Sequence, residues 1–277
     1  WIPMGVDAIE PDPNIQFTPE NFFMGVYDGN GYKIKNFTSS GFFLSEQYVE
    51  IPYVCGLFYI IGQGGVVKKL SLFDFELLQI EGSSGAMAPF AVMCFGLIEL
   101  CSSIGQITAV SESANFASGF TIFNGDGEIR NSYSIVTIEN FRYAGGISGH
   151  DESLIKASNT YSIFSSSTEG EYFGIGAMYP EDSDRITNYY NSDSLPEVIY
   201  PDYDGVPKTT LEMKQQSTYE GWDFDTVWGI DPAKNDGYPY LRVFVNEEIP
   251  TIYQFANGAG TEADPYQVAT AADLNGV

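Results

Sequence analysis

The feature that most constrains this chain is a short phrase that returns at a nearly fixed interval. Each clear copy starts with glycine and reaches isoleucine or valine two or three residues later. Subtracting the numbers of successive markers gives intervals of 33, 31, 31, 26 and 31 residues. The markers are Ile34, Val67, Ile98 and Ile129, followed by the degenerate copies at Ile155 and Ile186. A period of this length predicts a repeat architecture in which each cycle is one structural unit.

A second glycine-led apolar run lies between the markers, as in Gly56-Leu57-Phe58, Gly119-Phe120 and Gly174-Ile175. Both runs are too short for helices and are rich in β-branched and aromatic residues, which predicts short strands. Because the whole period repeats, each strand should pair in parallel with its equivalent in the next cycle. We therefore expect an all-β fold, a right-handed parallel β-helix or β-solenoid. An antiparallel sandwich is the alternative, but its strands are more closely spaced and repeat no phrase.

In a solenoid of this kind, one marker residue per cycle points into the lumen. Equivalent residues then stack at the strand spacing of about 4.8 Å. All six markers, from Ile34 to Ile186, are predicted to form this lumen ladder. The glycines before each run are expected at tight corners.

The regular cycle ends after Tyr190, where Asp, Ser and Pro residues predict turns. Thr209 or Thr210 can cap a helix of about two turns through Gln216. An aromatic-rich segment follows, and we expect it to act as a plug or side flap, because a solenoid exposes apolar surface and strand edges. The predicted cap residues are Trp222, Trp228, Tyr238 and Tyr240. An aromatic platform for sugars is the functional alternative.

These observations divide the chain into residues 1–204 as the solenoid and 205–249 as the helix and cap, and the family resemblance described below implies that 250–277 begins the next tandem module. Tyr189, Tyr190, Tyr200 and Tyr203 are candidates for a contact face with a protein or glycan, or for stacking along the solenoid.

Charge excludes one class of partner. The chain has 37 acidic and 12 basic residues, with a formal net charge of −25, and this surface repels the phosphates of nucleic acids. The same charge favours solubility. No run of eighteen apolar residues is present, so the sequence predicts no membrane span.

Candidates for catalysis are few. His150 is the single histidine, and it lacks the partner histidine of a zinc-binding helix. Cys55, Cys94 and Cys101 lack metal-site spacing, and we expect buried thiols, with a disulfide as the alternative. Paired carboxylates are the remaining enzymatic hypothesis, because two nearby acids can cleave polysaccharides. The acidic clusters are Glu181, Asp182 and Asp184, and Asp202 with Asp204.

Two oxygen-rich turns are candidates for calcium binding, although simple turn formation explains them as well and no cofactor is required. Their candidate ligands are Asp28 and Asn30 in the first turn, and Asp126 and Glu128 in the second. Asn36-Phe37-Thr38 is an N-glycosylation acceptor sequence, and Asn36 is otherwise an ordinary corner residue.

The phrases together resemble the GLUG-motif repeats of large secreted or surface-attached bacterial proteins, including adhesins and the non-catalytic region of immunoglobulin A-cleaving metallopeptidases. The resemblance covers nearly the whole chain. It is carried by Phe23 to Tyr32, Gly56-Leu57-Phe58, the repeated Gly-x-Ile phrase, Gly221-Trp222-Asp223-Phe224 and Gly237-Tyr238-Pro239-Tyr240-Leu241. It implies an extracellular, non-enzymatic structural module at the cell surface, such as an adhesin stalk or a filament unit.

Residues 257–275 resemble the opening of such a module, and Trp1-Ile2-Pro3 resembles a point further inside one. We therefore expect a window from a tandem array, whose modules contact copies of themselves or their neighbours head-to-tail. A surface glycan or protein is a further candidate ligand. Binding or cleavage of carbohydrate is the alternative function.

Overall fold

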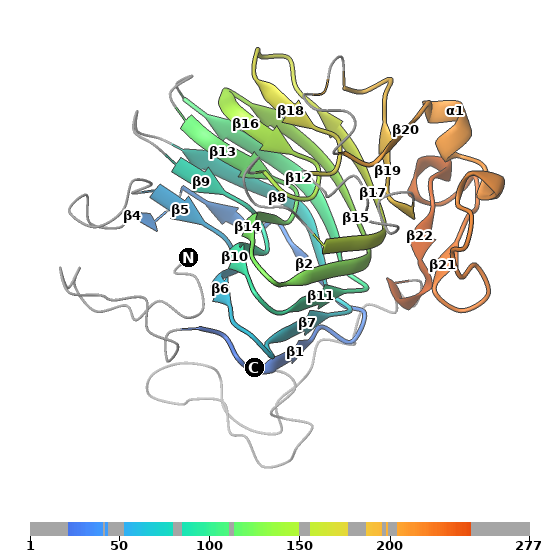
Figure 1. Ribbon diagram of the computed structural model, residues 1–277, viewed down its shortest axis with the longest axis horizontal. Helices are drawn as coiled ribbons and strands as arrows, with labels where there is room; N and C mark the ends of the chain where they lie inside the picture. Colours follow the sequence, from blue (N-terminus) through green and yellow to red (C-terminus); the bar gives the residue numbers. More distant parts are fainter. Residues whose placement is uncertain are drawn as a thin grey trace, which may run out of the picture. The chain divides into compact units, whose positions relative to one another are not determined.

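The computed structural model describes residues 22–40, 42–43, 53–79, 85–110, 114–149, 156–176, 187–195, 198 and 204–244. These residues belong to one compact unit that ends at Phe244 (Figure 1). Among the described strands, β4 with β5 and β21 with β22 are antiparallel, and all other strand pairings are parallel. The prediction of an all-β parallel solenoid is therefore confirmed, and an antiparallel sandwich is excluded. The predicted 250–277 segment lies outside the described residues.

The largest sheet, which we call the long sheet, has eleven described strands in two arms. The first arm contains β1 (Val26–Asp28), β7 (Val66–Lys68), β11 (Leu97–Glu99) and the first halves of β15 (Glu128–Glu139) and β17 (Lys156–Ser165). The second arm contains β2 (Lys33–Lys35), β3 (Thr38–Ser39), β8 (Ser71–Gln79), β12 (Ser102–Ala109), the second halves of β15 and β17, β19 (Tyr189–Asn191) and β20 (Val206–Lys208). Because β20 belongs to this sheet, the solenoid continues just past residue 204.

Two smaller sheets complete the described coils. One contains β6 (Phe58–Ile61), β10 (Ala91–Cys94) and β14 (Thr121–Asn124). The other contains β4 (Phe42–Phe43), β5 (Tyr53–Cys55), β9 (Gly85–Met87), β13 (Ala114–Ser118), β16 (Phe141–Gly145) and β18 (Glu171–Phe173). Apolar side chains from all three sheets fill the lumen, where the rings of Phe90 and Phe120 stack 4.7 Å apart.

The bend between the two arms is made by residues in the left-handed backbone region. Lys69, Leu100, Asn131 and Asn159 occupy this corner with φ between 46° and 55°. The Asn159 side-chain amide donates to Asn131 Oδ1 at 3.3 Å, which links two corners. The sequence predicted glycines at tight corners, but this corner is made by non-glycine residues, which stacking and hydrogen bonding hold in this conformation.

The lumen ladder contains three of the predicted markers. Val67, Ile98 and Ile129 are in parallel register and fully buried. The ladder continues with Tyr27 on one side and Ala157 on the other. Ala157 thus holds the register position that the sequence assigned to Ile155, and both Ile155 and Ile186 lie outside the described residues.

Ile34 does not belong to this ladder. It pairs with Leu72 on the second arm, where it packs against the lumen core. The reason is the length of the first corner: Lys33 follows Asp28 by five residues, whereas the equivalent Ser71 follows Lys68 by three. The first glycine phrase therefore marks the strand after the corner, not the strand before it.

The aromatic segment is a side flap, not an end plug. Tyr133, Tyr161 and Tyr189 are in register on the outer face of the long sheet, and the first two rings stack 5.0 Å apart. Residues of the 210–244 segment cover these rings, and we call this buried group the cap cluster (Figure 1). Its buried members are Met213, Tyr219, Trp222, Trp228, Tyr238, Leu241 and Phe244. Their burial shields an aromatic outer face from water.

The helix of the cap is shorter than predicted. α1 spans Thr210–Met213, and Thr209 is its N-cap in a capping box with Glu212. A 3₁₀ turn at Gln216–Thr218 replaces the second helical turn. The short strands β21 (Trp228–Gly229) and β22 (Tyr240–Leu241) pair farther along, and 3₁₀ turns lie at Asn235–Gly237 and Arg242–Phe244. In the described part of the chain, no helix is long and apolar enough to cross a membrane.

Candidate functional site

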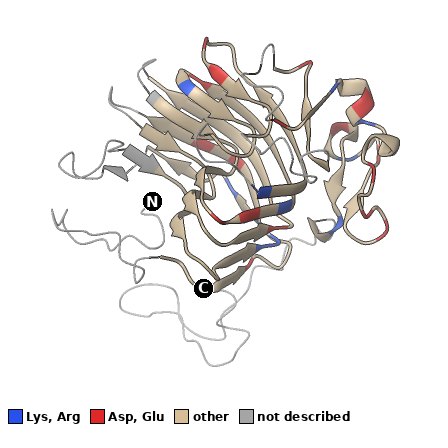
Figure 2. Cartoon of the chain, viewed as in Figure 1, with Lys and Arg blue, Asp and Glu red and all other residues tan. Residues whose placement is uncertain are grey.

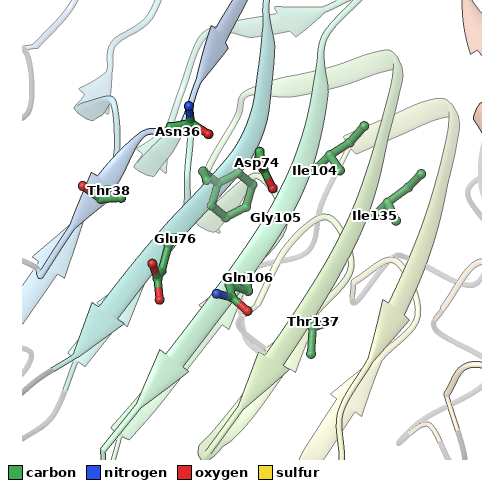
Figure 3. Close-up of a pocket in the computed structure, with 10 residues that line it drawn as sticks. Asn36, Thr38, Asp74, Glu76, Ile104, Gly105, Gln106, Ile135 and Thr137 are labelled. Carbon is green, nitrogen blue, oxygen red and sulfur yellow. The ribbon is translucent and has the colours of Figure 1, made fainter.

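An open groove of about 600 Å³ lies on the outer face of the second arm (Figure 3). It crosses four coils, from the β2–β3 region through β8 and β12 to β15. Six polar side chains line it, and we call them the groove residues. They are Asn36, Thr38, Asp74, Glu76, Gln106 and Thr137. Four of them form one continuous register row: Thr38, Glu76, Gln106 and Thr137.

A register irregularity shapes this groove. Ile104 pairs with Phe73, but the next residue, Gly105, pairs with Phe75, so that Asp74 is an extra residue in β8. Asp74 has a φ of 59°, and Asn36 at the same level of the preceding coil has a φ of 56°. Bulges of this kind redirect side chains and are common near functional sites.

The groove floor combines backbone and apolar side chains. A side chain at Gly105 would collide with the carbonyl and ring of Phe75, so glycine is required there. Ile104 and Ile135 line the groove and also pack against the cap cluster. The groove therefore runs alongside the edge of the cap.

Elsewhere on the outer face, outward polar side chains tend to pair with a side chain of the next coil. In the row Asp28–Lys68–Glu99–Arg130, charges alternate from coil to coil (Figure 2). Farther along β15, Glu139 accepts from the Ser167 hydroxyl at 2.9 Å, and Thr137, in the last coil of the groove, also pairs outward, with its Oγ1 3.1 Å from Ser165 Oγ. Outward polar residues thus tend to pair with the next coil.

The groove residues of the first three coils do not follow that rule. Among the described residues, the side chains of Asn36, Thr38, Asp74, Glu76 and Gln106 form no hydrogen bond or ion pair with the protein. Stacked neighbours only about 4.8 Å away were available to pair with them. The groove therefore presents a set of free donors and acceptors at one place.

Two lysines of β2 directly precede Asn36, at one end of the groove. The ammonium groups of Lys33 and Lys35 lie 5.0 and 6.0 Å from the centre of the Phe73 ring, in cation–π contact. Lys35 and Phe73 share the register row that continues to Ile104 in the groove. The two lysines therefore place two positive charges over Phe73, the residue next to Asp74.

The sequence singled out Asn36 as a glycosylation acceptor or, alternatively, as an ordinary corner residue. The structure leaves it exposed, at the bulge, with its N–H donating to Phe73 O at 3.1 Å. Asn36-Phe37-Thr38 and Asp74-Phe75-Glu76 share a polar–Phe–polar pattern at the same register. That repeated triplet is the sequence signal that could have located the groove.

Each of the two candidate calcium turns has a basic side chain beside its carboxylates. Asp28 Oδ2 lies 3.6 Å from Lys68 Nζ, and Asp126 Oδ1 lies 3.6 Å from Lys156 Nζ. Glu128 Oε1 lies 3.7 Å from Arg130 Nη1, and Asn30 donates its N–H to Asp28 Oδ1. A neighbouring ammonium or guanidinium competes with a cation, so these contacts argue against calcium. Within the described residues, no group of three or more His, Cys, Asp or Glu residues is placed to hold a metal.

Asp204 is structural and not part of an exposed acid pair. Its carboxylate accepts N–H groups from Gly174, Ile175 and Gly176 at 2.5, 2.8 and 3.2 Å. In the preceding coil, Ile147 instead donates its N–H to the Ile175 carbonyl. The Asp204 carboxylate thus accepts the N–H groups that backbone carbonyls of a further coil would otherwise accept. Burial raises the pKa of its carboxyl to about 6, although these N–H groups and that of Gly205 act to lower it. Its predicted partner Asp202 lies outside the described residues, as do Glu181, Asp182, Asp184 and His150.

The aromatic candidates are buried and do not form a surface platform. Trp222 and Trp228 are 7% and 0% exposed, and their rings lie 4.5 Å apart within the cap cluster. Tyr238 is also buried, whereas Tyr240 is partly exposed and its ring contacts the Lys234 ammonium. The sugar-platform alternative for the cap is therefore wrong, because the tryptophan faces cover the tyrosines of the long sheet.

Tyr189 and Tyr190 are each 5% exposed, so they do not form an outer contact face. Tyr189 packs under the cap and Tyr190 in the lumen core, whereas Tyr200 and Tyr203 lie outside the described residues.

The three cysteines are free and buried, as the first of the two sequence alternatives predicted. Burial raises the pKa of the Cys94 and Cys101 thiols to about 12. These thiols are therefore protonated at neutral pH and suit packing.

Comparison with known proteins gives one partial likeness. No protein-family model matches the chain, and no solved structure matches it. A putative Gly-rich membrane protein of Evansella cellulosilytica is 27% identical over 144 residues, which cover 51% of this chain and 13% of that protein. This likeness assigns neither a family nor an activity.

Proposed function

We propose that this chain is a non-enzymatic structural module of an extracellular surface protein. The observation that carries the proposal is that side chains both inside and outside the solenoid pack or pair with the equivalent residues of the next coil. Inside, Val67, Ile98 and Ile129 stack in register. Outside, Glu99 and Arg130 pair across coils. Such an array holds a fixed length and direction, which suits a spacer or stalk.

Two further observations support this proposal. The GLUG-like phrases resemble repeats of secreted and surface-attached proteins. The Evansella protein carries the description of a membrane protein, and the matched segment is a small fraction of its length. A match to such a small fraction of a long protein is what we expect of a stalk module that is repeated within a long surface protein. The net charge of −25 suits a solvent-exposed module that must not self-associate.

The last strand of the long sheet limits how modules meet. The N–H of Val206 donates to Asn188 O, and Lys208 O accepts from the Ser192 N–H, so both residues face β19. Pro207, between them, is exposed, faces the opposite side and has no N–H to donate. We therefore propose that neighbouring modules are joined through the polypeptide and not by strand pairing at β20.

Labelling of intact cells that produce the protein tests its location. An antibody raised against this chain should stain unpermeabilised cells, and external protease should remove the stain. A cytoplasmic protein serves as the control and should stay unlabelled. Staining that appears only after permeabilisation would overturn the proposal.

A further inference from the structure

We propose that the groove on the second arm binds a neutral, hydroxyl-rich oligosaccharide through its free polar side chains. This inference goes beyond the structural role and does not depend on it. It starts from the contrast along the outer face: polar residues pair across coils elsewhere, but Asn36, Thr38, Asp74, Glu76 and Gln106 do not pair within the described protein. Donors and acceptors that the fold leaves free at one hollow are available to a ligand.

The mixture of groups indicates the ligand's chemistry. Asn36 and Gln106 offer amides that both donate and accept, Thr38 offers a hydroxyl, and Asp74 and Glu76 accept. A sugar hydroxyl likewise donates and accepts. An anionic ligand would meet two carboxylates within a strongly acidic protein.

The border of the groove disfavours a cationic peptide. Lys33 and Lys35 are held over Phe73, in the register row next to the groove residues. The formal charges of Lys33, Lys35, Asp74 and Glu76 sum to zero, so these four side chains give this part of the face no net formal charge. A neutral ligand avoids repulsion from both sets.

The shape indicates a chain of sugars. The groove row extends over four coils from Thr38 to Thr137, a span of roughly 14 Å at the ordinary strand spacing. The groove is open, and Ile104 and Ile135 provide an apolar strip along the cap edge. Apolar C–H faces of sugar rings can lie on that strip while the hydroxyls reach the polar row (Figure 3).

Binding of purified full chain to defined hexasaccharides tests the proposal. The neutral probes are cellohexaose, chitohexaose and maltohexaose, the anionic probe is hexagalacturonate, and the cationic probe is hexalysine. Calorimetry and saturation-transfer NMR should show binding of at least one neutral probe and of neither charged probe. The proposal is overturned if no neutral probe binds at millimolar concentration, or if hexalysine or hexagalacturonate binds instead.

Variants then place the binding in the groove. The pair Thr38→Ala with Gln106→Ala should weaken binding of the neutral probe at least tenfold, with an unchanged melting temperature. Gln216→Ala, an exposed glutamine in the cap, is the matched control and should bind like the parent chain. Equal binding by the double variant would overturn the assignment. The length of the hexasaccharide probes is measured after incubation with the protein. Cleavage of a probe to shorter products would contradict the non-enzymatic role, but it would leave the assignment of the groove as the binding site in place.

Discussion

The Arg130 guanidinium donates two hydrogen bonds to one carboxylate oxygen of Glu99 on the neighbouring coil, from Nε at 3.0 Å and from Nη2 at 2.8 Å. This contact raises the pKa of Arg130, chiefly through the hydrogen bond to Glu99. Asp28 and Lys68 extend the same row in the same order, an acidic residue followed by a basic one on the next coil. A shift of one coil by one residue would remove the row, so it helps to specify register.

A double-mutant cycle measures this contact. We expect Glu99→Ala and Arg130→Ala to show a coupling of about 0.5–1 kcal/mol in the free energy of unfolding, because Arg130 remains 40% exposed. The coupling should fall in about 1 M salt, where charges are screened over about 3 Å. The matched control is the more exposed pair Asp126 and Lys156, for which we expect almost no coupling. Equal coupling in both pairs would contradict the assigned role.

The lumen ladder should control stability. Ile98→Ala removes a fully buried side chain between Val67 and Ile129, and we expect it to lower the free energy of unfolding by about 2–5 kcal/mol. Val26→Ala, on the 65% exposed side chain of β1, should change it by less than about 0.5 kcal/mol. Urea titration followed by circular dichroism measures both. Similar losses for the two variants would refute a packed lumen at Ile98.

The edge strand β20 should resist pairing because of its proline. Pro207→Thr restores an outward N–H, so we expect the variant to associate at high concentration through this edge. Light scattering after gel filtration should show a rise in mass with concentration. Pro232→Thr, at an exposed position in the cap, is the control and should elute like the parent protein. A monomeric Pro207→Thr variant would show that other groups protect the edge.

Asp204 should give a distinct pH dependence. Its folded-state pKa of about 6 lies above the ordinary value of 3.8, so the folded protein binds this proton more tightly than the unfolded chain does. Its contribution therefore favours folding at acid pH and is lost as the pH rises from about 4 to 6. The full change is about 3 kcal/mol at 1.36 kcal/mol per pKa unit.

Comparison of the parent protein with the Asp204→Asn variant isolates the contribution of this carboxyl to the pH dependence of stability. Between pH 7 and pH 4, the parent protein should gain stability relative to this variant, as measured by urea titration at each pH. Asp223→Asn provides a control of opposite sign, because hydrogen bonds from Thr226 lower the pKa of Asp223. The parent should lose stability relative to that variant as the pH falls below the ordinary carboxyl pKa value of 3.8, so this control is extended to more acid pH. The same sign for both comparisons would rule out the role given to Asp204.

Little of the candidate site was readable from the sequence, which singled out Asn36 alone among the groove residues. Outside the groove, the residues after the markers Val67, Ile98 and Ile129 are Lys68, Glu99 and Arg130, so the period alone places these three in one row. The groove itself could not be predicted from the sequence. Its hollow depends on a register shift in the pairing of β8 and β12, between Ile104 and Gly105, and the spacing of the repeats does not indicate this shift. The corner residues were also missed: Leu100 takes a positive φ only because its neighbours in the stack hold it there.

The period by itself determined the fold and the stacking of Val67, Ile98 and Ile129, because equal numbers of residues per coil bring equivalent side chains into line. The tertiary structure alone decided that Tyr27, not Ile34, continues that column, since the first corner is two residues longer. It also decided that Trp222 and Trp228 cover a flank of the solenoid. The composition predicts that aromatic rings will be buried. Their site of burial is set by Tyr133 and Tyr161, which point outward from the long sheet and pack against the cap cluster.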